Sequence, residues 1–368
     1  MATISFKDVS SSSADNISAL QNFTLEIQDR EFVVLTGPPG CGKSTALRVL
    51  AGLNEISNGD IFIGDRRVNE MAPKDRDVAM VFRNEALYPH MSVRDNLAFG
   101  LKKRKFSETE IKKRIAGAAE ILGIQKLLER RPADLSLVQR QRVAVARAVA
   151  RKPKVLLFDE VLSHLEPVSR AQLQTEIQKL RHRVDSTIIY ATRDSAEAMT
   201  LADRIVVMNA GAIEQEGAPL AIYNTPANLF VAEFLGAPPM NFLHGVLKQE
   251  RDSLLFSELG EGTIELRWPI SECAGAIDFV GKPVVVGVRP EGISVVASAN
   301  SPESFPVIID AVQRTGTGTI LHLQTGSHAL LCTTQVAIDG AANGRRLRIA
   351  LDSKKAHLFD RISTRRIA

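Results

Sequence analysis

A short stretch, Gly37–Thr45, most constrains how this chain can fold. It reads GPPGCGKST and matches the pattern G-x-x-x-x-G-K-[ST], in which a glycine-rich loop joins a strand to a helix. The continuous apolar run Phe32–Leu35 precedes it and predicts a strand that is buried on both faces. A helix is expected to begin near Lys43. The sequence therefore predicts an α/β fold built around a loop that can hold phosphate.

The residue types in this loop suit phosphate groups. Glycines allow backbone N–H groups to curl around phosphate oxygens, and the positive end of the following helix adds to the attraction. Lys43 would reach the terminal phosphates of a nucleotide, and the Ser44 hydroxyl would bind Mg²⁺. The alternative is a glycine-rich turn that binds no ligand, and the strand–loop–helix context argues against it. The candidate nucleotide-binding residues are Gly37, Pro38, Pro39, Gly40, Cys41, Gly42, Lys43, Ser44 and Thr45.

Two carboxylates follow a second apolar run. Val155–Phe158 predicts another buried strand, and Asp159 and Glu160 come directly after it. The carboxyl ends of strands are where α/β sheets bind ligands. Asp159 therefore suits a contact with Mg²⁺, and Glu160 suits the polarisation of a water that attacks a phosphate. An acidic pair at a strand end is by itself more often solvated, so the catalytic interpretation depends on the phosphate loop.

Length and composition indicate the number of domains and argue against some classes of partner. The chain has 368 residues, which exceeds the roughly 250 to 300 residues of one hydrophobic core and predicts two domains. Its 46 basic and 42 acidic residues are intermixed, which argues against a nucleic-acid partner. No signal peptide and no apolar run of roughly 18 to 20 residues is seen, so no direct membrane span is expected. Three distant cysteines, Cys41, Cys273 and Cys332, favour a reduced cytoplasmic protein.

Alternating strands and helices predict a first domain over residues 1–236. Residues from about 90 to 150 are expected to form a helical subdomain inserted between strands. The alternation implies a parallel sheet that is covered on both faces. Further strands of this domain are expected at Ile4–Phe6, Phe23–Ile27, Val78–Phe82, Thr187–Ala191 and Ile205–Met208.

A second domain is expected over residues 237–368. The dipeptide Pro238-Pro239 marks the boundary, and the pattern then changes to short apolar runs separated by turn residues. Such a pattern is typical of a small all-β domain. Its strands are expected at Val284–Val288, Val307–Val312, Thr319–Leu323 and Ala329–Cys332.

Segments in both domains resemble the ATPase subunits of carbohydrate-type ABC importers, the group that includes the maltose and glycerol-3-phosphate importer ATPases. They are Pro73–Asp77 (PKDRD), Ala86–Asn96 (ALYPHMSVRDN), Gln139–Ala148 (QRQRVAVARA), Glu197–Asn209 (EAMTLADRIVVMN), Gly287–Glu291 (GVRPE) and His357–Asp360 (HLFD). The resemblance covers nearly the whole chain. It implies a P-loop, RecA-like core with a parallel sheet and helical subdomain, followed by a regulatory all-β domain of OB or TOBE type.

The resemblance also implies cofactors and partners. In this family two ATPase subunits dimerise and hold ATP and Mg²⁺ between the phosphate loop of one and the signature helix of the other. The dimer, a homodimer or a heterodimer, drives transmembrane permease subunits. The chain is thus expected to be cytoplasmic and peripheral on the inner face of the plasma membrane. The family receives the permease near Ala86–Asn96, so Leu87, Tyr88 and Met91 are the expected partner contacts, although apolar residues there can also be ordinary core.

Two departures from the family pattern fall on its working residues. The signature L-S-G-G-Q reads Leu135-Ser136-Leu137-Val138-Gln139 here. The two glycines normally let a helix N-terminus approach the γ-phosphate held by the partner, so Leu137 and Val138 predict a steric block. The glutamine that follows Val-Phe in the family is Arg83, which carries a fixed positive charge and cannot bind a metal ion.

Other departures affect further contact positions. The switch histidine expected after Tyr-x-Thr is Arg193, which can still touch a phosphate. The aromatic residue expected to stack on adenine is absent, with Ser13 and Ala14 in its place. Two changes are milder: Val161 replaces a proline, and Ser163-His164-Leu165-Glu166 replaces S-x-L-D.

Two functional readings therefore follow. In the first, the chain is the nucleotide-binding subunit of an ABC importer, binds Mg-ATP, hydrolyses it and energises uptake of a carbohydrate-type solute. In the alternative, Arg83, Leu137, Val138 and Arg193 leave a catalytically impaired nucleotide-binding or scaffolding subunit with little or no ATP hydrolysis. A small-molecule kinase with the same phosphate loop would leave Ala86–Asn96 and the second domain without explanation.

Overall fold

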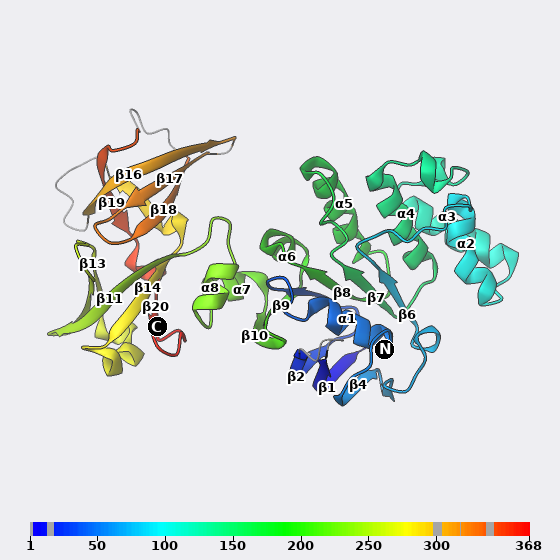
Figure 1. Cartoon of the computed structure of the whole chain (residues 1–368), viewed down its shortest axis with the longest axis horizontal. Helices are drawn as coiled ribbons and strands as arrows, with labels where there is room; N and C mark the ends of the chain where they lie inside the picture. Colours follow the sequence, from blue (N-terminus) through cyan, green and yellow to red (C-terminus); the bar gives the residue numbers. More distant parts are fainter. Residues whose placement is uncertain (1–2, 13–17, 297–303, 317, 336–341) are drawn as a thin grey trace. The chain divides into compact units, whose positions relative to one another are not determined.

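The structure is a computed structural model that describes residues 3–12, 18–296, 304–316, 318–335 and 342–368 (Figure 1). These residues gather into two compact units, Met1–Ile222 and Tyr223–Ala368. The first unit combines helices with strands, and the second consists mainly of strands. This arrangement confirms the predicted class, an α/β core followed by an all-β domain.

A six-stranded sheet forms the centre of the first unit, with the strand order β10-β9-β3-β8-β7-β6. Neighbouring strands run parallel except for β10, which pairs antiparallel with β9. Every residue of β3, β7 and β8 is buried, as expected of continuous apolar runs covered on both faces. The strands are β3 (Phe32–Thr36), β6 (Val78–Val81), β7 (Val155–Asp159), β8 (Thr187–Thr192), β9 (Arg204–Asn209) and β10 (Ala212–Gly217).

A second, antiparallel sheet has the order β2-β1-β4-β5. Its strands are β1 (Ile4–Ser12), β2 (Ser18–Ile27), β4 (Asn58–Ile63) and β5 (Arg66–Arg67). The helix α1 (Lys43–Ala51) packs between this sheet and the central one, and its apolar side chains join both in one core (Figure 1). The sequence predicts β1 and β2 shorter than they are and misses β4 and β5, where few side chains are buried.

Three helices form the helical subdomain of the predicted fold: α2 (Val93–Lys103), α3 (Glu108–Ile121) and α4 (Leu137–Ala150). Each begins after a serine whose hydroxyl accepts a hydrogen bond from an N–H group of the first turn. A serine at this position stabilises a helix by about 1 kcal/mol. Two short 3₁₀ turns, η2 (Gln125–Leu127) and η3 (Pro132–Asp134), join α3 to α4.

Two further helices cover the sheet. They are α5 (Pro167–Leu180), which follows β7, and α6 (Ser195–Leu201), which follows β8. The helix α6 packs on β3 and β8, while α1 packs on β7 and β8 from the opposite face (Figure 1). The parallel sheet therefore has helices on both sides. Within the described ranges, no helix has the length and apolar character needed to cross a membrane.

Arg76 ties the end of α1 to the segment that enters β6. Its guanidinium donates hydrogen bonds to the carbonyl oxygens of Val49 (2.7 Å) and Leu50 (3.1 Å), in the last turn of α1. It also donates to the carbonyl oxygens of Asn69 (3.1 Å) and Met71 (2.9 Å). The last carbonyls of a helix lack partners within the helix, so this buried cation satisfies them. The 3₁₀ turn η1 (Pro73–Asp75) leads directly into Arg76.

The second unit contains two antiparallel sheets of five strands that share one hydrophobic core. The first, in the order β13-β12-β11-β14-β20, consists of β11 (Asn241–Glu250), β12 (Ser253–Glu258), β13 (Glu265–Pro269), β14 (Pro283–Val288) and β20 (Ala356–Asp360). The second, in the order β15-β19-β16-β17-β18, consists of β15 (Ile293–Val296), β16 (Ser304–Thr315), β17 (Gly318–Gln324), β18 (Ala329–Thr334) and β19 (Arg346–Leu351). Short 3₁₀ turns are η4 (Ile270–Glu272), η5 (Ala274–Phe279), η6 (Pro290–Gly292) and η7 (Ser353–Lys355).

The second unit begins before the predicted boundary at residue 236. The helix α7 (Pro219–Asn224) spans the division, and α8 (Leu229–Phe234) lies within the second unit. The physical reason is Arg289, whose guanidinium donates to the carbonyl oxygens of Ala232, Leu235 and Tyr223. Arg289 also lies 3.9 Å from the ring centroid of Tyr223. A boundary predicted from the dipeptide Pro238-Pro239 does not take these contacts into account, because they join residues far apart in the sequence.

His357 on β20 makes the stability of the second unit depend on pH. Burial, together with the nearby Arg366 and Arg289, lowers the pKa of His357 from 6.5 to about 4. The folded state therefore binds this proton less readily than the unfolded chain does. The stabilisation is fully present above pH 6.5 and is lost as the pH falls towards 4. Between pH 7 and pH 5 the loss is expected to be about 2 kcal/mol.

Urea unfolding followed by the fluorescence of Trp268 tests this expectation, because Trp268 is the only tryptophan and lies buried in the second unit. His357→Gln should reduce the difference in free energy of unfolding between pH 7 and pH 5. His182→Gln, at an exposed histidine of the first unit, should leave that difference unchanged. An equal pH dependence in the wild type and His357→Gln would contradict the assignment.

Candidate functional site

The phosphate loop lies between β3 and the N-terminal end of α1. Gly42 is the N-cap of α1, with φ of 103°, and no side chain caps this end. The first turn also contains no acidic residue. The first N–H groups of a helix have no partners within the helix, and the helix dipole makes this end positive. An uncapped N-terminus of this kind fits an anionic ligand.

Two glycines of the loop stand where a side chain does not fit. A Cβ atom on Gly37 would lie 2.2 Å from the carbonyl oxygen of Met208, at the end of β9. A Cβ atom on Gly42 would lie 2.4 Å from the carbonyl oxygen of Ala19. The backbone therefore has to pass close to its neighbours here, and only glycine allows this path. Gly40, with φ of 80°, faces open space.

Lys43 is a buried cation at the first position of α1. Its side chain donates hydrogen bonds to the carbonyl oxygens of Gly37 (2.8 Å) and Pro38 (2.9 Å), and Cys41 Sγ lies 3.4 Å away. Lys43 is only 4% exposed, and within the described part of the chain it forms no ion pair. A buried ammonium group is unfavourable unless a negative charge compensates it. The phosphates of ATP would supply that charge, so the loop fits the nucleotide.

Ser44 and Asp159 lie side by side. The Ser44 hydroxyl donates to Asp159 Oδ1 over 2.6 Å, and Asp159 is buried at the end of β7. Both are oxygen ligands of the kind that Mg²⁺ prefers. No group of three or more histidines, cysteines or carboxylates that could hold a metal occurs among the described residues. Mg²⁺ commonly uses one or two protein ligands together with water and substrate phosphates, so this pair fits the ion.

Glu160 follows Asp159 and lies beside Arg83. The Glu160 side chain is 17% exposed, and its Oε2 lies 3.8 Å from Arg83 Nη1. Its backbone is fixed, because Glu160 N–H donates to the carbonyl oxygen of Ala191 and φ is 50°. The Nε of Arg83 forms a hydrogen bond with His164 Nε2. The sequence predicts Glu160 and Arg83 as separate site positions. It does not predict that the two side chains form an ion pair.

The altered signature begins α4. Ser136 and Gln139 form a capping box, in which each side chain accepts a hydrogen bond from the backbone N–H of the other residue. Leu137 is 40% exposed, and Val138 is half-buried. Leu137 also lines a cavity of about 280 Å³ together with Arg83, Gln141, Val161 and His164. The structure thus brings the altered signature next to the altered glutamine position. The roles of these residues stay predictions.

The structure shows less about two other predicted positions, the switch-histidine position and the adenine-stacking position. Arg193 lies exposed directly after β8. The next residue, Asp194, caps α6 and forms an ion pair with Arg170 at 3.5 Å. Ser13 and Ala14 lie outside the described residues, so the prediction about adenine stacking has no structural counterpart.

The expected partner segment is held against the helical subdomain. Leu87, Tyr88 and Met91 are all partly buried. The Tyr88 ring packs 4.7 Å from that of Phe99, centroid to centroid, and lines a groove of about 240 Å³. The side chain of Asn96 bonds both the N–H (2.8 Å) and the carbonyl oxygen (3.1 Å) of Tyr88. The sequence places Asn96 inside the resembling segment but gives no sign that its fully buried side chain fixes this turn.

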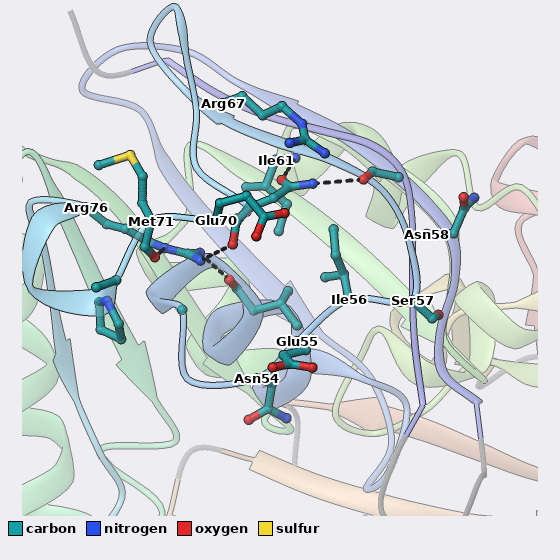
Figure 2. Close-up of a pocket in the computed structure, with 16 residues that line it drawn as sticks. Asn54, Glu55, Ile56, Ser57, Asn58, Ile61, Arg67, Glu70, Met71 and Arg76 are labelled. Carbon is teal, nitrogen blue, oxygen red and sulfur yellow. Dashed lines mark hydrogen bonds between the residues drawn. The ribbon is translucent and has the colours of Figure 1, made fainter.

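A separate cavity of about 710 Å³ lies beside the C-terminal end of α1 (Figure 2). Its lining includes polar side chains that already have partners, such as Arg67, which bonds Asp60 at 2.6 Å. Figure 2 shows Arg76 reaching into its wall, where the guanidinium bonds backbone carbonyls. The phosphate loop lies at the other end of α1, so this cavity is not the predicted nucleotide site.

Three family models match the chain. The model described as ABC transporter matches residues 20–163, that of the MalK OB fold domain matches 236–293, and that of the TOBE domain matches 286–359. The order of these matches follows the order of the two structural units.

Curated proteins match over almost the full length. The chain is 44% identical to sn-glycerol-3-phosphate import ATP-binding protein UgpC 3 of Agrobacterium fabrum, over 98% of both chains. It is 44% identical to the oligosaccharides import ATP-binding protein MsmX of Bacillus subtilis, over 93% of both. It is 42% identical to the trehalose/maltose import ATP-binding protein MalK of Thermococcus litoralis, over 95% of this chain and 96% of that protein.

Solved structures resemble part of the chain. The protein cbiO1 of Clostridium perfringens, part of an ABC transporter complex, has a TM-score of 0.56 and 26% identity, covering 60% of this chain and 90% of its own. A dimeric bacterial ABC transporter cassette has a TM-score of 0.53 and 27% identity, covering 59% of this chain and 98% of its own.

Proposed function

The chain belongs to the ABC transporter family of import ATP-binding proteins, and on that premise we propose that it binds Mg-ATP and energises solute uptake through permease subunits. The observation that supports this most directly is Lys43, a buried cation at the N-terminus of α1 that forms no ion pair with any carboxylate among the described residues. The printed names of the relatives support a carbohydrate-type solute, since they include oligosaccharides, trehalose, maltose and glycerol-3-phosphate.

Different residues of this chain would have different roles in hydrolysis. Lys43 and the N–H groups that begin α1 would hold the phosphates of ATP. Ser44 and Asp159 would hold Mg²⁺, which neutralises charge on the transferred phosphoryl group. Glu160 would accept a hydrogen bond from the attacking water and orient it. Phosphoryl transfer depends on positioning and charge stabilisation more than on covalent chemistry, so small displacements of these groups affect the rate strongly.

The partners follow from the family. Dimeric structures exist among the solved cassettes that resemble this chain. We propose that two ATP-binding subunits form a dimer, as a homodimer or with a related subunit, and that permease subunits bind at Leu87, Tyr88 and Met91. The protein would then work in the cytoplasm, at the inner face of the plasma membrane. The groove beside Tyr88 and Phe99 supports this docking position, because it combines aromatic surface with the guanidinium of Arg147.

Tyr88→Asp is expected to abolish co-purification of the chain with permease subunits of the same importer. The substitution would remove the aromatic contact with Phe99 and place a charged group, which is costly to desolvate, at the interface. Affinity purification from cells that express all subunits measures this. Leu220→Asp, at a residue that is 69% exposed on α7, provides the control and should not affect recovery. Full recovery of the complex with Tyr88→Asp would contradict the docking position.

Phosphate release by the purified protein tests the function and its alternative. The assay uses Mg-ATP, with Glu160→Gln and Lys43→Ala as blanks. Turnover clearly above both blanks supports an ATP-hydrolysing subunit. Turnover equal to the blanks, with ATP still bound, supports the alternative of a nucleotide-binding subunit that does not hydrolyse.

A further inference from the structure

We propose that Arg83 is a positioning residue that holds Glu160 in an ion-paired resting state and thereby limits the rate of hydrolysis. This inference rests on the proposed function. It concerns side chains of this chain alone: Arg83 after β6, and Glu160 and His164 after β7.

The register of the sheet forces Arg83 and Glu160 together. The strands β6 and β7 are parallel neighbours, and Val81 pairs with Phe158. Arg83 stands two residues beyond Val81, and Glu160 stands two residues beyond Phe158. Both therefore leave the sheet at the same level of its carboxyl edge. The Arg83 side chain can therefore reach Glu160.

His164 fixes which atom of Arg83 faces Glu160. The Nε of Arg83 forms a hydrogen bond with His164 Nε2, and Nη1 of the same guanidinium lies 3.8 Å from Glu160 Oε2. The guanidinium is planar and rigid, so holding one nitrogen orients the others. His164 in turn comes from the loop that Glu160 begins, where Ser163 N–H and hydroxyl both bond the carbonyl oxygen of Glu160. Arg83 thus joins His164 and Glu160 in one cluster.

The cluster weakens Glu160 as an acceptor for water. A carboxylate that faces a guanidinium at 3.8 Å has part of its charge compensated, so it attracts the protons of a water less strongly. A neutral glutamine, as found in the family at this position, places no such charge there. The half-exposed Arg83 side chain can leave Glu160, so the contact limits turnover rather than abolishing it.

Arg83→Gln is expected to raise kcat for phosphate release roughly tenfold, a part of the 10² to 10⁴ that general acid–base catalysis supplies, with little change in KM. Arg67→Gln is the matched control, since Arg67 is 50% exposed and ion-paired to Asp60, as Arg83 is 47% exposed and paired to Glu160. The comparison is repeated with Leu137 and Val138 replaced by glycine, so that a blocked signature does not mask the effect.

A nucleotide-free measurement tests the cluster itself. In protein labelled with ¹⁵N-arginine, the Arg83 Nε–H signal is identified by its absence in Arg83→Gln. It should shift in His164→Ala and in Glu160→Gln, and should not shift in Arg67→Gln. His164→Ala should also raise kcat, by less than Arg83→Gln, and should add nothing to it in the double variant.

The outcomes separate this inference from the proposed function. An unshifted Nε–H signal, or a kcat of Arg83→Gln at or below that of the wild type in both signature backgrounds, overturns the inference while ATP binding stands. Failure of the wild-type protein to bind ATP would overturn the proposed function. The Arg83 Nε–H signal of the nucleotide-free protein would still show whether the cluster exists.

Discussion

Lys43→Ala is expected to weaken binding of ATP at least 100-fold, or by about 2.7 kcal/mol. The wild-type ammonium group is buried, contacts only neutral groups and lies where the phosphates would bind. Hydrogen bonds between charged partners contribute about 1.5 to 3 kcal/mol, and Lys43 can offer more than one. Titration with a fluorescent ATP analogue, without hydrolysis, measures the change in Kd.

The loss should be specific to the site and leave the fold intact. Removing Lys43 also removes an uncompensated buried charge, so thermal unfolding of the free protein should not move to lower temperature. Lys74→Ala, at an exposed lysine of η1, should bind the analogue as the wild type does. Undiminished binding by Lys43→Ala would remove the strongest argument for a nucleotide site at this loop.

Replacing both Leu137 and Val138 by glycine is expected to raise phosphate release by about 10- to 100-fold. These residues begin α4, and the family has glycine at both positions so that the backbone can approach the phosphates of a facing subunit. Leu137 instead presents an exposed branched side chain. Removing it would restore the close approach that positioning of the γ-phosphate requires. Dimer formation with Mg-ATP in the Glu160→Gln background, measured by light scattering, should increase in parallel.

The control for this double change is Val168→Gly, which places glycine in the first turn of α5. Val168 is 73% exposed, so this variant reproduces the helix-propensity cost of one of the two glycines, up to about 1 kcal/mol, without touching the signature. Phosphate release that rises equally in Val168→Gly, or fails to rise in the double glycine variant, would contradict the steric block.

The sequence predicts the central sheet well because its strands are buried on both faces. Short continuous apolar runs such as Val155–Phe158 favour buried strands, and each of the predicted runs became a strand. The missed strands of the first unit, β4, β5 and β10, consist mostly of partly buried or exposed residues. In the second unit the predicted runs became β14, β16, β17 and β18. The strands β11, β12, β13, β15, β19 and β20 were missed, and β11 and β19 carry charged residues such as Lys248 and Arg346.

The candidate site also contains parts that the sequence predicts and parts that only the fold reveals. The residues of the phosphate loop can be predicted from the sequence because they are adjacent in the chain. Glycines allow the backbone to pass close to its neighbours, and the lysine provides the positive charge that attracts phosphate. The contact between Arg83 and Glu160 depends on strand register, which joins residues more than seventy positions apart in the chain. Likewise, only the fold reveals that Arg76 bonds the last turn of α1. Motifs therefore predict the atoms that meet the ligand, while the surrounding contacts come from tertiary structure.

The contacts of Arg76 give α1 a mechanical property. A short helix with hydrogen bonds intact along its length moves as a stiff rod. One end of this rod is the phosphate loop, and the other is fastened by Arg76 to the segment that continues into β6. The phosphate loop and the segment that enters β6 are therefore joined through one short helix and one buried side chain, Arg76.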